Sequence, residues 1–196
     1  MKVLVGCEYS GTVRDAFIKR GHEAISCDLL PTESPGPHYR GDIMDVLSAD
    51  LSWDLIILHP DCTYMAVSGN GTYANTQKRN YAVLWTLDLW NTAIKRSKRV
   101  CLENPQSVIL PKLRQLGAKI QYIQPYQFGH PETKKTGLAL HGLPELFPSF
   151  DVSLLMDTLP NKEKHKVWYA SPGESRGKQR SIFFTGIANA MANQWG

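Results

Sequence analysis

A thiol and a carboxyl group follow two successive apolar segments of the sequence. Cys62 comes two residues after WDLIILHP, and Glu103 lies near the end of KRVCLEN. A deprotonated thiol is a strong nucleophile, and a partly buried carboxyl group can donate a proton near neutral pH. Cys62 also precedes a polar loop, so we expect its side chain to be exposed. The two residues together indicate covalent catalysis assisted by an acid.

Two further features follow apolar segments near the amino terminus. GCEYSG overlaps the end of the first segment, and Asp28 ends the segment HEAISCD. An open α/β sheet binds its ligand at the carboxyl ends of its strands, where all four features would meet. Simpler interpretations remain open: GCEYSG as a tight turn, and Asp28 as a solvated carboxylate. Cys7, Cys27 and Cys101 are most simply small buried hydrophobic residues.

Short apolar strands alternate with helices along most of the chain. The expected strands are 2–6, 22–28, 53–60, 98–104, 118–124 and 136–142, and the expected helices are 10–21, 78–97, 105–117 and 181–195. Ser10 is expected to cap the first helix, and residues 142–180 are expected to form loops. The alternation predicts one α/β domain with a mostly parallel sheet and helices on both faces.

The composition excludes several classes of protein. With 42% hydrophobic and 20% charged residues the chain is too apolar to be disordered, and no stretch approaches the roughly 20 apolar residues of a membrane span. The net charge of +4 permits an anionic partner. The four cysteines form no C-x-x-C pair and no signal peptide is evident, so we expect a cytoplasmic protein with reduced thiols. His59 and Cys62 are too few ligands to predict a zinc site.

Six segments in order resemble the cytosine carbon-5 DNA methyltransferases, which transfer a methyl group from S-adenosylmethionine. They are CEYSGTVRDAFIKRGHEAISCD, GDIMDV, DLIILHPDCTYMAVSG, LENPQ, FGHPETKKTGLALHG and TGIANAMANQW. The resemblance covers nearly the whole chain, in a compact form similar to phage and prophage versions. It implies a Rossmann-like S-adenosylmethionine-dependent methyltransferase fold, DNA as partner, no metal, and the host cytoplasm as location if a phage encodes the protein.

The resemblance also implies which residues bind the cofactor. Asp28 would hold the ribose hydroxyls, Asp42 and Ile43 would lie against the adenine, and Gly11 would allow a close backbone approach. The full implied set is Cys7, Glu8, Tyr9, Gly11, Asp28, Leu29, Asp42, Ile43, Pro60 and Thr185.

Catalytic and substrate-binding roles follow from the same resemblance. Cys62 would add to carbon 6 of cytosine, which makes carbon 5 nucleophilic. Glu103, positioned by Asn104, would protonate or hydrogen-bond ring nitrogen 3. Lys134 would assist catalysis, and the implied substrate contacts are Ser68, Gly69, Lys134, Lys135 and Thr136. An enzyme of this kind that acts on duplex DNA must flip the base out of the stack.

Three positions depart from the family pattern. Asp61 replaces a proline beside the thiol, and its carboxylate opposes thiolate formation. Tyr9 replaces a glycine of the cofactor loop, and Thr136 replaces an arginine for which Lys134 or Lys135 could substitute. These departures also suit a non-catalytic relative that only binds nucleic acid or cofactor. The segment HPDCTY leaves open an exocyclic-amino methyltransferase, whose chemistry needs no thiol.

Residues 143–180 occupy the interval where the family has a target-recognition lobe, and they are too few to form one. The segment carries two aromatic residues and six cations: Trp168, Tyr169, Lys162, Lys164, Lys166, Arg176, Lys178 and Arg180. It is either a solvated loop or a short clamp on the nucleic-acid backbone, with weak sequence selectivity and strong salt dependence. Single-stranded DNA or a free nucleotide is therefore an alternative to duplex DNA as substrate.

Overall fold

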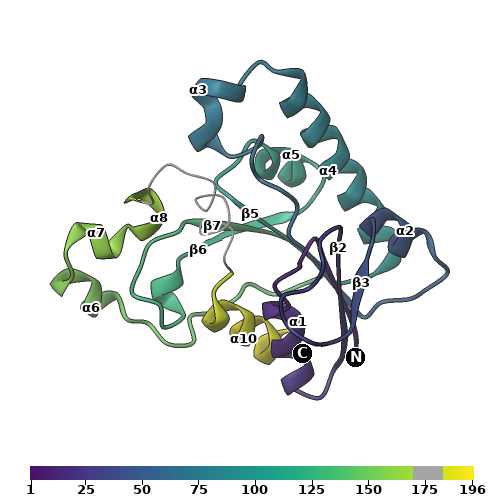
Figure 1. Ribbon diagram of the computed structural model, residues 1–196, viewed down its shortest axis with the longest axis horizontal. Coiled ribbons are helices and arrows are strands. Elements are labelled where there is room, and N and C mark those ends of the chain that lie inside the picture. The colour runs from purple at the N-terminus through teal and green to yellow at the C-terminus, as the bar shows by residue number, and fades with distance from the viewer. Residues whose placement is uncertain (170–182) are drawn as a thin grey trace.

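A seven-stranded sheet forms the centre of the computed structural model (Figure 1), which describes residues 1–169 and 183–196. The strands are β1 (Lys2–Gly6), β2 (Glu23–Asp28), β3 (His38–Arg40), β4 (Leu55–Leu58), β5 (Val100–Pro105), β6 (Lys119–Ile123) and β7 (Thr136–His141). Their order is β3-β2-β1-β4-β5-β7-β6, and all neighbours are parallel except that β7 is antiparallel to β5 and β6. The predicted α/β class and mostly parallel sheet are confirmed.

Helices cover both faces of this sheet. Helices α1 (Thr12–Lys19) and α10 (Thr185–Gln194) pack together on one face, and α2 (Ile43–Ser48), α4 (Gln77–Arg96) and α5 (Ile109–Gln115) lie on the other (Figure 1). Successive side chains of a strand point to opposite faces. In β1, Val3 and Val5 therefore join the core beneath α1 and α10, whereas Leu4 joins the core beneath α2 and α4.

The first helix begins later than expected and has a different cap. It begins at Thr12, and the carboxyl group of Glu8 accepts hydrogen bonds from the backbone N–H groups of Val13 (2.6 Å) and Arg14 (3.3 Å). Ser10, the expected cap, accepts only the N–H of Thr12, at 3.2 Å. The residue between Ser10 and the helix, Gly11, has a left-handed backbone with φ 75°, and the N–H groups that follow it are capped by Glu8.

Residues 142–180 differ from the expected loops in their described part. They contain the short helices α6 (Ser153–Thr158), α7 (Asn161–Lys164) and α8 (Lys166–Tyr169). Helices this short lack a recognisable apolar period and depend on tertiary contacts. Here the carbonyl of Lys164 accepts the N–H of Thr133 at 2.8 Å. Three expected clamp residues, Arg176, Lys178 and Arg180, lie outside the described residues.

Other segments also carry short elements that the sequence did not predict, among them α2. The Pro-rich connection after β2 contains β3, and the polar loop after Cys62 contains η1 (Val67–Gly69) and α3 (Asn70–Tyr73). A further turn of 3₁₀ helix, η2 (Pro125–Gln127), follows β6. None of the described helices is long and apolar enough to cross a membrane.

A buried arginine holds the Pro-rich connection against the sheet. Arg14 is fully buried, and its guanidinium group donates to the hydroxyl of Ser26 at 3.1 Å and the carbonyl of Ser34 at 2.9 Å. Gly11 has φ 75°, and a Cβ atom there would collide with this guanidinium group. The conformation of Gly11 thus makes room for Arg14, and the Arg14 hydrogen bonds fix the loop beside the carboxyl end of β2.

Candidate active site

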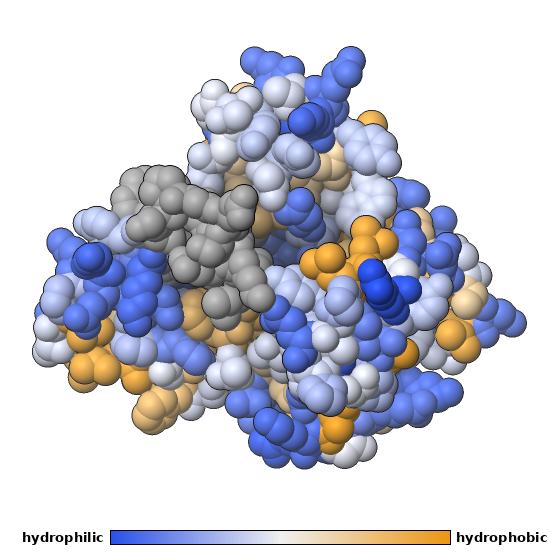
Figure 2. All heavy atoms as spheres, in the orientation of Figure 1, coloured by the Kyte–Doolittle hydropathy of each residue, from blue (hydrophilic) through white to orange (hydrophobic). Residues whose placement is uncertain are grey.

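A cavity of about 1090 Å³ opens at the carboxyl ends of β1, β2, β4 and β5. Strand β1 has β2 on one side and β4 on the other, so the chain connections diverge here and leave a crevice. Figure 2 shows a recess in the surface below α3 and α4. Thirteen of the predicted site residues line the cavity: Cys7, Glu8, Tyr9, Asp28, Leu29, Asp42, Ile43, Pro60, Cys62, Ser68, Gly69, Glu103 and Lys134.

The cavity wall is rich in carboxyl groups. Glu8, Asp28, Glu33, Asp42, Asp61 and Glu103 line it, whereas Lys134 is the one lysine or arginine among its described lining residues. Such a wall favours a ligand with positive charge or hydroxyl groups and disfavours one rich in phosphate. No three or more His, Cys, Asp or Glu side chains of the described chain form a group that could hold a metal ion.

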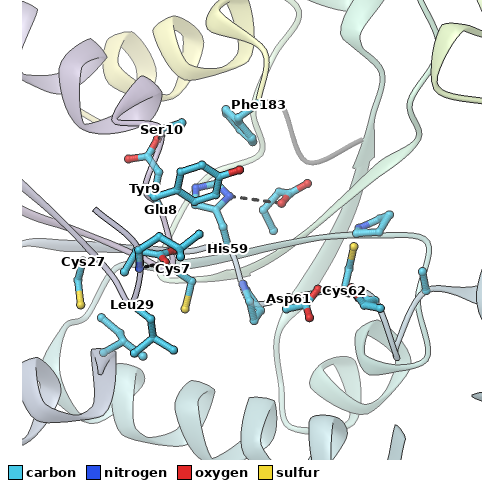
Figure 3. Close-up of a pocket in the computed structure, with 18 of the residues that line it drawn as sticks. Cys7, Glu8, Tyr9, Ser10, Cys27, Leu29, His59, Asp61, Cys62 and Phe183 are labelled. Carbon is cyan, nitrogen blue, oxygen red and sulfur yellow. Dashed lines mark hydrogen bonds and ion pairs between the residues drawn. The ribbon is translucent and has the colours of Figure 1, made fainter. Parts of the chain in front are cut away.

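Cys7, which follows β1, and Cys27 of β2 line the part of the cavity that also carries Glu8, Asp28 and Asp42, here called the acidic half (Figure 3). Cys7 adopts φ 58°, a conformation that only a few per cent of non-glycine residues adopt. Burial and the nearby Asp28 raise the pKa of the Cys7 thiol far above its ordinary value. The same two causes raise the pKa of Cys27 to about 12. Both thiols therefore stay protonated at neutral pH.

Two aspartates of this half each use one oxygen to hold the backbone. Asp28 Oδ1 accepts the N–H of Leu30, and Asp42 Oδ1 accepts the N–H of Met44, both at 2.9 Å. In the described chain the second oxygen of each accepts no hydrogen bond. Each aspartate is thus fixed by its own loop and keeps one oxygen for a ligand.

The loop that carries Cys62 is held from several sides. The Cys62 carbonyl accepts the N–H groups of Met65 at 3.0 Å and Ala66 at 2.8 Å, which forms a tight turn. Asp61 Oδ1 accepts the N–H of Thr63 at 2.9 Å and its hydroxyl at 2.6 Å. Asp61, which the sequence suggested as an obstacle to the thiolate, therefore also has a structural role in this turn.

Arg79, which sequence analysis did not single out, lies beneath the Cys62 loop. It is 6% exposed, and it donates to the carbonyls of Tyr64 at 2.6 Å and Ala66 at 3.3 Å and to the side chain of Asn70 at 2.8 Å. The one sequence signal was a charged residue in the first turn of a largely apolar helix. Its partners could not be inferred, because they belong to a segment whose turns and short helices the sequence pattern does not predict.

The side chain of Asn104 contacts the loop that carries Cys62. It does not contact Glu103, contrary to expectation. Its side chain is fully buried, and Nδ2 donates to the carbonyl of Pro60 at 3.2 Å. Adjacent residues of a strand point to opposite faces, so Asn104 turns away from the side on which Glu103 lines the cavity. Two backbone bonds, from Val67 to Gln106 and from Val108 to Met65, join the same segments. Because these bonds hold the residues just before it, α5 begins at Ile109 and not at residue 105, where the sequence predicted its start.

His59 is a second functional candidate, which the sequence analysis considered only as a possible zinc ligand. Its Nδ1 lies 3.3 Å from Oε2 of Glu103, and their side chains are 11% and 13% exposed. The His59 ring also meets the ring of Phe183 edge-on, with 4.8 Å between centroids. Figure 3 shows His59 between the Cys7 side and the Cys62 side of the cavity, with its contact to Glu103 dashed.

Five predicted site residues do not line the cavity: Gly11, Asn104, Lys135, Thr136 and Thr185. Lys135 Nζ lies over the ring of Tyr122, 4.5 Å from its centroid. Thr136 is buried in β7 and donates to the carbonyl of Lys134 at 3.0 Å. Thr185 is exposed at the start of α10. Lys134 is thus the residue of its segment that reaches the site.

Comparison with known proteins supports the fold. No family model matches the chain. No curated protein matches it. A solved structure described as a DNA modification methyltransferase, encoded within an E. coli prophage, is 11% identical over 77% of this chain and 51% of that chain, with a TM-score of 0.51. The chain has a methyltransferase-like fold.

Two further solved structures are similar at lower scores. S. pombe Dnmt2 methyltransferase is 16% identical over 89% of this chain and 61% of that chain, with a TM-score of 0.47. Entamoeba histolytica methyltransferase EhMeth is 13% identical over 77% of this chain and 57% of that chain, with a TM-score of 0.49. At such identities the likeness concerns the fold alone, and this chain spans about half of the prophage protein.

Proposed function

We propose that this protein is an S-adenosylmethionine-dependent methyltransferase that acts on carbon 5 of cytosine in DNA through a covalent adduct with Cys62. The observation that supports it best is that Cys62 and Glu103 line one cavity whose other half is acidic. A nucleophile and an acid are what the attack on cytosine requires.

The residues of the acidic half fit S-adenosylmethionine. The cofactor has no phosphate group, and its sulfonium and ammonium groups are cationic, which suits a wall with many carboxyl groups. Phosphate-bearing cofactors commonly bind the amino terminus of a helix, but in α1 Glu8 occupies that position. Asp28 and Asp42, each with an oxygen available, would hold the ribose and the adenine side, together with Leu29 and Ile43. The bound cofactor supplies an electrophilic methyl group.

The chain's own residues would carry out the covalent step. The Cys62 thiolate forms a bond to carbon 6, and the electron pair of the carbon 5–carbon 6 double bond moves toward carbon 5. Glu103 gives its proton to ring nitrogen 3, which offsets the negative charge on the ring. After carbon 5 is methylated, a base such as water takes the proton of carbon 5, and the electron pair of that carbon–hydrogen bond re-forms the double bond to carbon 6. The sulfur–carbon bond breaks at the same time, the Cys62 thiolate leaves, and ring nitrogen 3 returns its proton to Glu103. Lys134, the cation of the cavity wall, would favour the thiolate against the opposing charge of Asp61.

The proposal also includes a clamp, the basic residues of α7 and α8, that binds the nucleic-acid backbone with little sequence selectivity. Lys162, Lys164, Lys166 and Tyr169 lie on α7 and α8 and supply cations and one exposed aromatic ring. Binding through phosphates weakens steeply as salt rises. We therefore expect the affinity for a DNA oligonucleotide, measured by fluorescence anisotropy, to fall steeply between 50 and 200 mM salt, on the order of a hundredfold for about four phosphate contacts. A flat salt response would contradict the clamp.

One experiment tests the proposed reaction. The protein is incubated with labelled S-adenosylmethionine and single-stranded DNA, duplex DNA or free nucleotides, and the products are digested for nucleoside mass spectrometry. We expect 5-methylcytosine with the wild type and none with Cys62→Ser. A product methylated on an exocyclic amine, largely unaffected by Cys62→Ser, would support the amino-methyltransferase alternative instead. Unmodified nucleosides with all substrates would overturn the proposed activity and favour a relative that only binds.

A further inference from the structure

We propose that His59 is the positioning residue of the acid: it holds one oxygen of Glu103 and leaves the other for the substrate. The inference depends on the proposed function, because it concerns how Glu103 would donate its proton. Its evidence is the 3.3 Å contact between His59 Nδ1 and Glu103 Oε2 and the surroundings of the imidazole ring.

The register of two neighbouring strands produces this contact. Strands β4 and β5 are parallel, and Leu58 is the partner of Leu102. The next residues, His59 and Glu103, therefore lie side by side at the strand ends, where neighbouring strands are about 4.8 Å apart. They share a face of the sheet, so the pairing of imidazole and carboxyl group is fixed by the backbone.

The surroundings of the ring assign its proton. Nε2 is buried and has no hydrogen-bond partner in the described chain, and the ring packs edge-on against Phe183. A buried N–H without an acceptor is costly. The assignment that leaves no such N–H is a neutral imidazole with its proton on Nδ1. That proton is donated to Oε2 of Glu103.

The consequence for Glu103 is an asymmetric carboxyl group. Oε2 accepts from His59, whereas Oε1 has no hydrogen bond in the described chain, and Glu103 lines the cavity. Oε1 is therefore the oxygen that would carry the proton to ring nitrogen 3. As that proton leaves, Glu103 becomes anionic, and the bond from Nδ1–H becomes charge-assisted and stronger. His59 thus stabilises the transition state more than the ground state.

Kinetics with three variants test this role. His59→Leu removes the N–H, and we expect kcat to fall roughly 10- to 100-fold, the loss of one hydrogen bond to a charged group, with KM for the DNA within about twofold. His59→Asn places an N–H near the position of Nδ1 and should restore most of kcat. His22→Leu is the control, because His22 does not line the cavity. An unchanged kcat in His59→Leu, or an equal loss in His59→Asn, would overturn the proposal.

A measurement without catalysis separates this inference from the proposed function. The imidazole ¹⁵N shifts of the ligand-free protein report which nitrogen carries the proton. We expect the Nδ1–H form for His59 in the wild type and loss of that preference in Glu103→Ala, with the folding of both proteins checked by circular dichroism. An Nε2–H form in the wild type would overturn the inference. If the wild type transfers no methyl group, the proposed function fails. The ¹⁵N shifts of His59 still show whether its Nδ1–H is donated to Glu103.

Discussion

Glu8 accepts a hydrogen bond of 2.6 Å from the backbone N–H of Val13, so a side-chain carboxyl group closes the amino terminus of α1. Glu8 is 5% exposed and lies in the turn between β1 and α1. The bond therefore fixes both the first helix and the wall of the cavity. It ties the geometry of the cavity wall to the stability of the fold.

Replacing Glu8 should therefore weaken the fold. In Glu8→Ala the first N–H groups of α1 lose their acceptor, and we expect the free energy of unfolding to fall by about 1–2 kcal/mol. Glu8→Gln keeps one acceptor oxygen and should lose less. Urea denaturation followed by circular dichroism measures both. Equal stability of Glu8→Ala and wild type would show that the bond contributes nothing.

Two glycines with left-handed backbones form a matched pair. Gly11 has φ 75° and Gly21 has φ 82°, but only at Gly11 would a Cβ atom meet the guanidinium group of Arg14; at Gly21 it meets nothing. Gly21→Ala should cost only the backbone strain, about 1 kcal/mol. Gly11→Ala adds overpacking against buried Arg14 and should cost about 2–4 kcal/mol. Thermal and urea unfolding compare the two, and equal losses would remove the special role of Gly11.

Acid should loosen the docking of α10. His130 Nε2 accepts the N–H of Gly186 at 3.0 Å, and burial lowers the pKa of His130, an effect that Glu132 partly opposes. A lowered pKa means that the folded protein favours the neutral ring. The stability that the neutral ring contributes is fully present at a pH above the ordinary histidine pKa of about 6.5. It is lost as the pH falls through the lowered pKa of the folded protein. Protonation removes the acceptor from the positive end of the helix dipole.

Unfolding experiments between pH 7.5 and pH 5 measure this effect. We expect the wild type to lose stability toward acid and His130→Gln to lose less over the same range. Gly186 offers no alternative arrangement, because a Cβ there would collide with the carbonyl of Phe128. A pH dependence identical in wild type and His130→Gln would assign the loss to other groups.

The four thiols should differ in reactivity. Burial raises the pKa of Cys7, Cys27 and Cys101, and the thiolate is the form that reacts with iodoacetamide. Near pH 7.5 we therefore expect Cys62 to be alkylated first, as measured by peptide mass spectrometry over time. Cys62→Ser should leave the protein almost unlabelled while folded. Faster labelling of Cys7 than of Cys62 would contradict this order.

The sequence by itself determined most of the long strands and helices, and the strand ends at which the candidate catalytic residues lie. Continuous apolar runs identify β1, β4 and β5, because strands buried on both faces need them. The residues at or just past the carboxyl ends of these apolar runs, among them Cys62 and Glu103, must lie at one edge of a parallel sheet. The long helix was predicted at 78–97 and is α4, Gln77–Arg96, because its length and apolar spacing are local properties.

Only the tertiary structure decided which side chains meet at that edge. His59 and Glu103 are 44 residues apart, and their contact depends on the order of the strands and on the register of Leu58 with Leu102. The direction of Asn104 toward Pro60 and the fit of Gly11 around Arg14 depend on the same packing. A local pattern encodes whether a residue is buried, but not its partner. The partner is set by contacts between distant segments, which form only when the sheet is assembled.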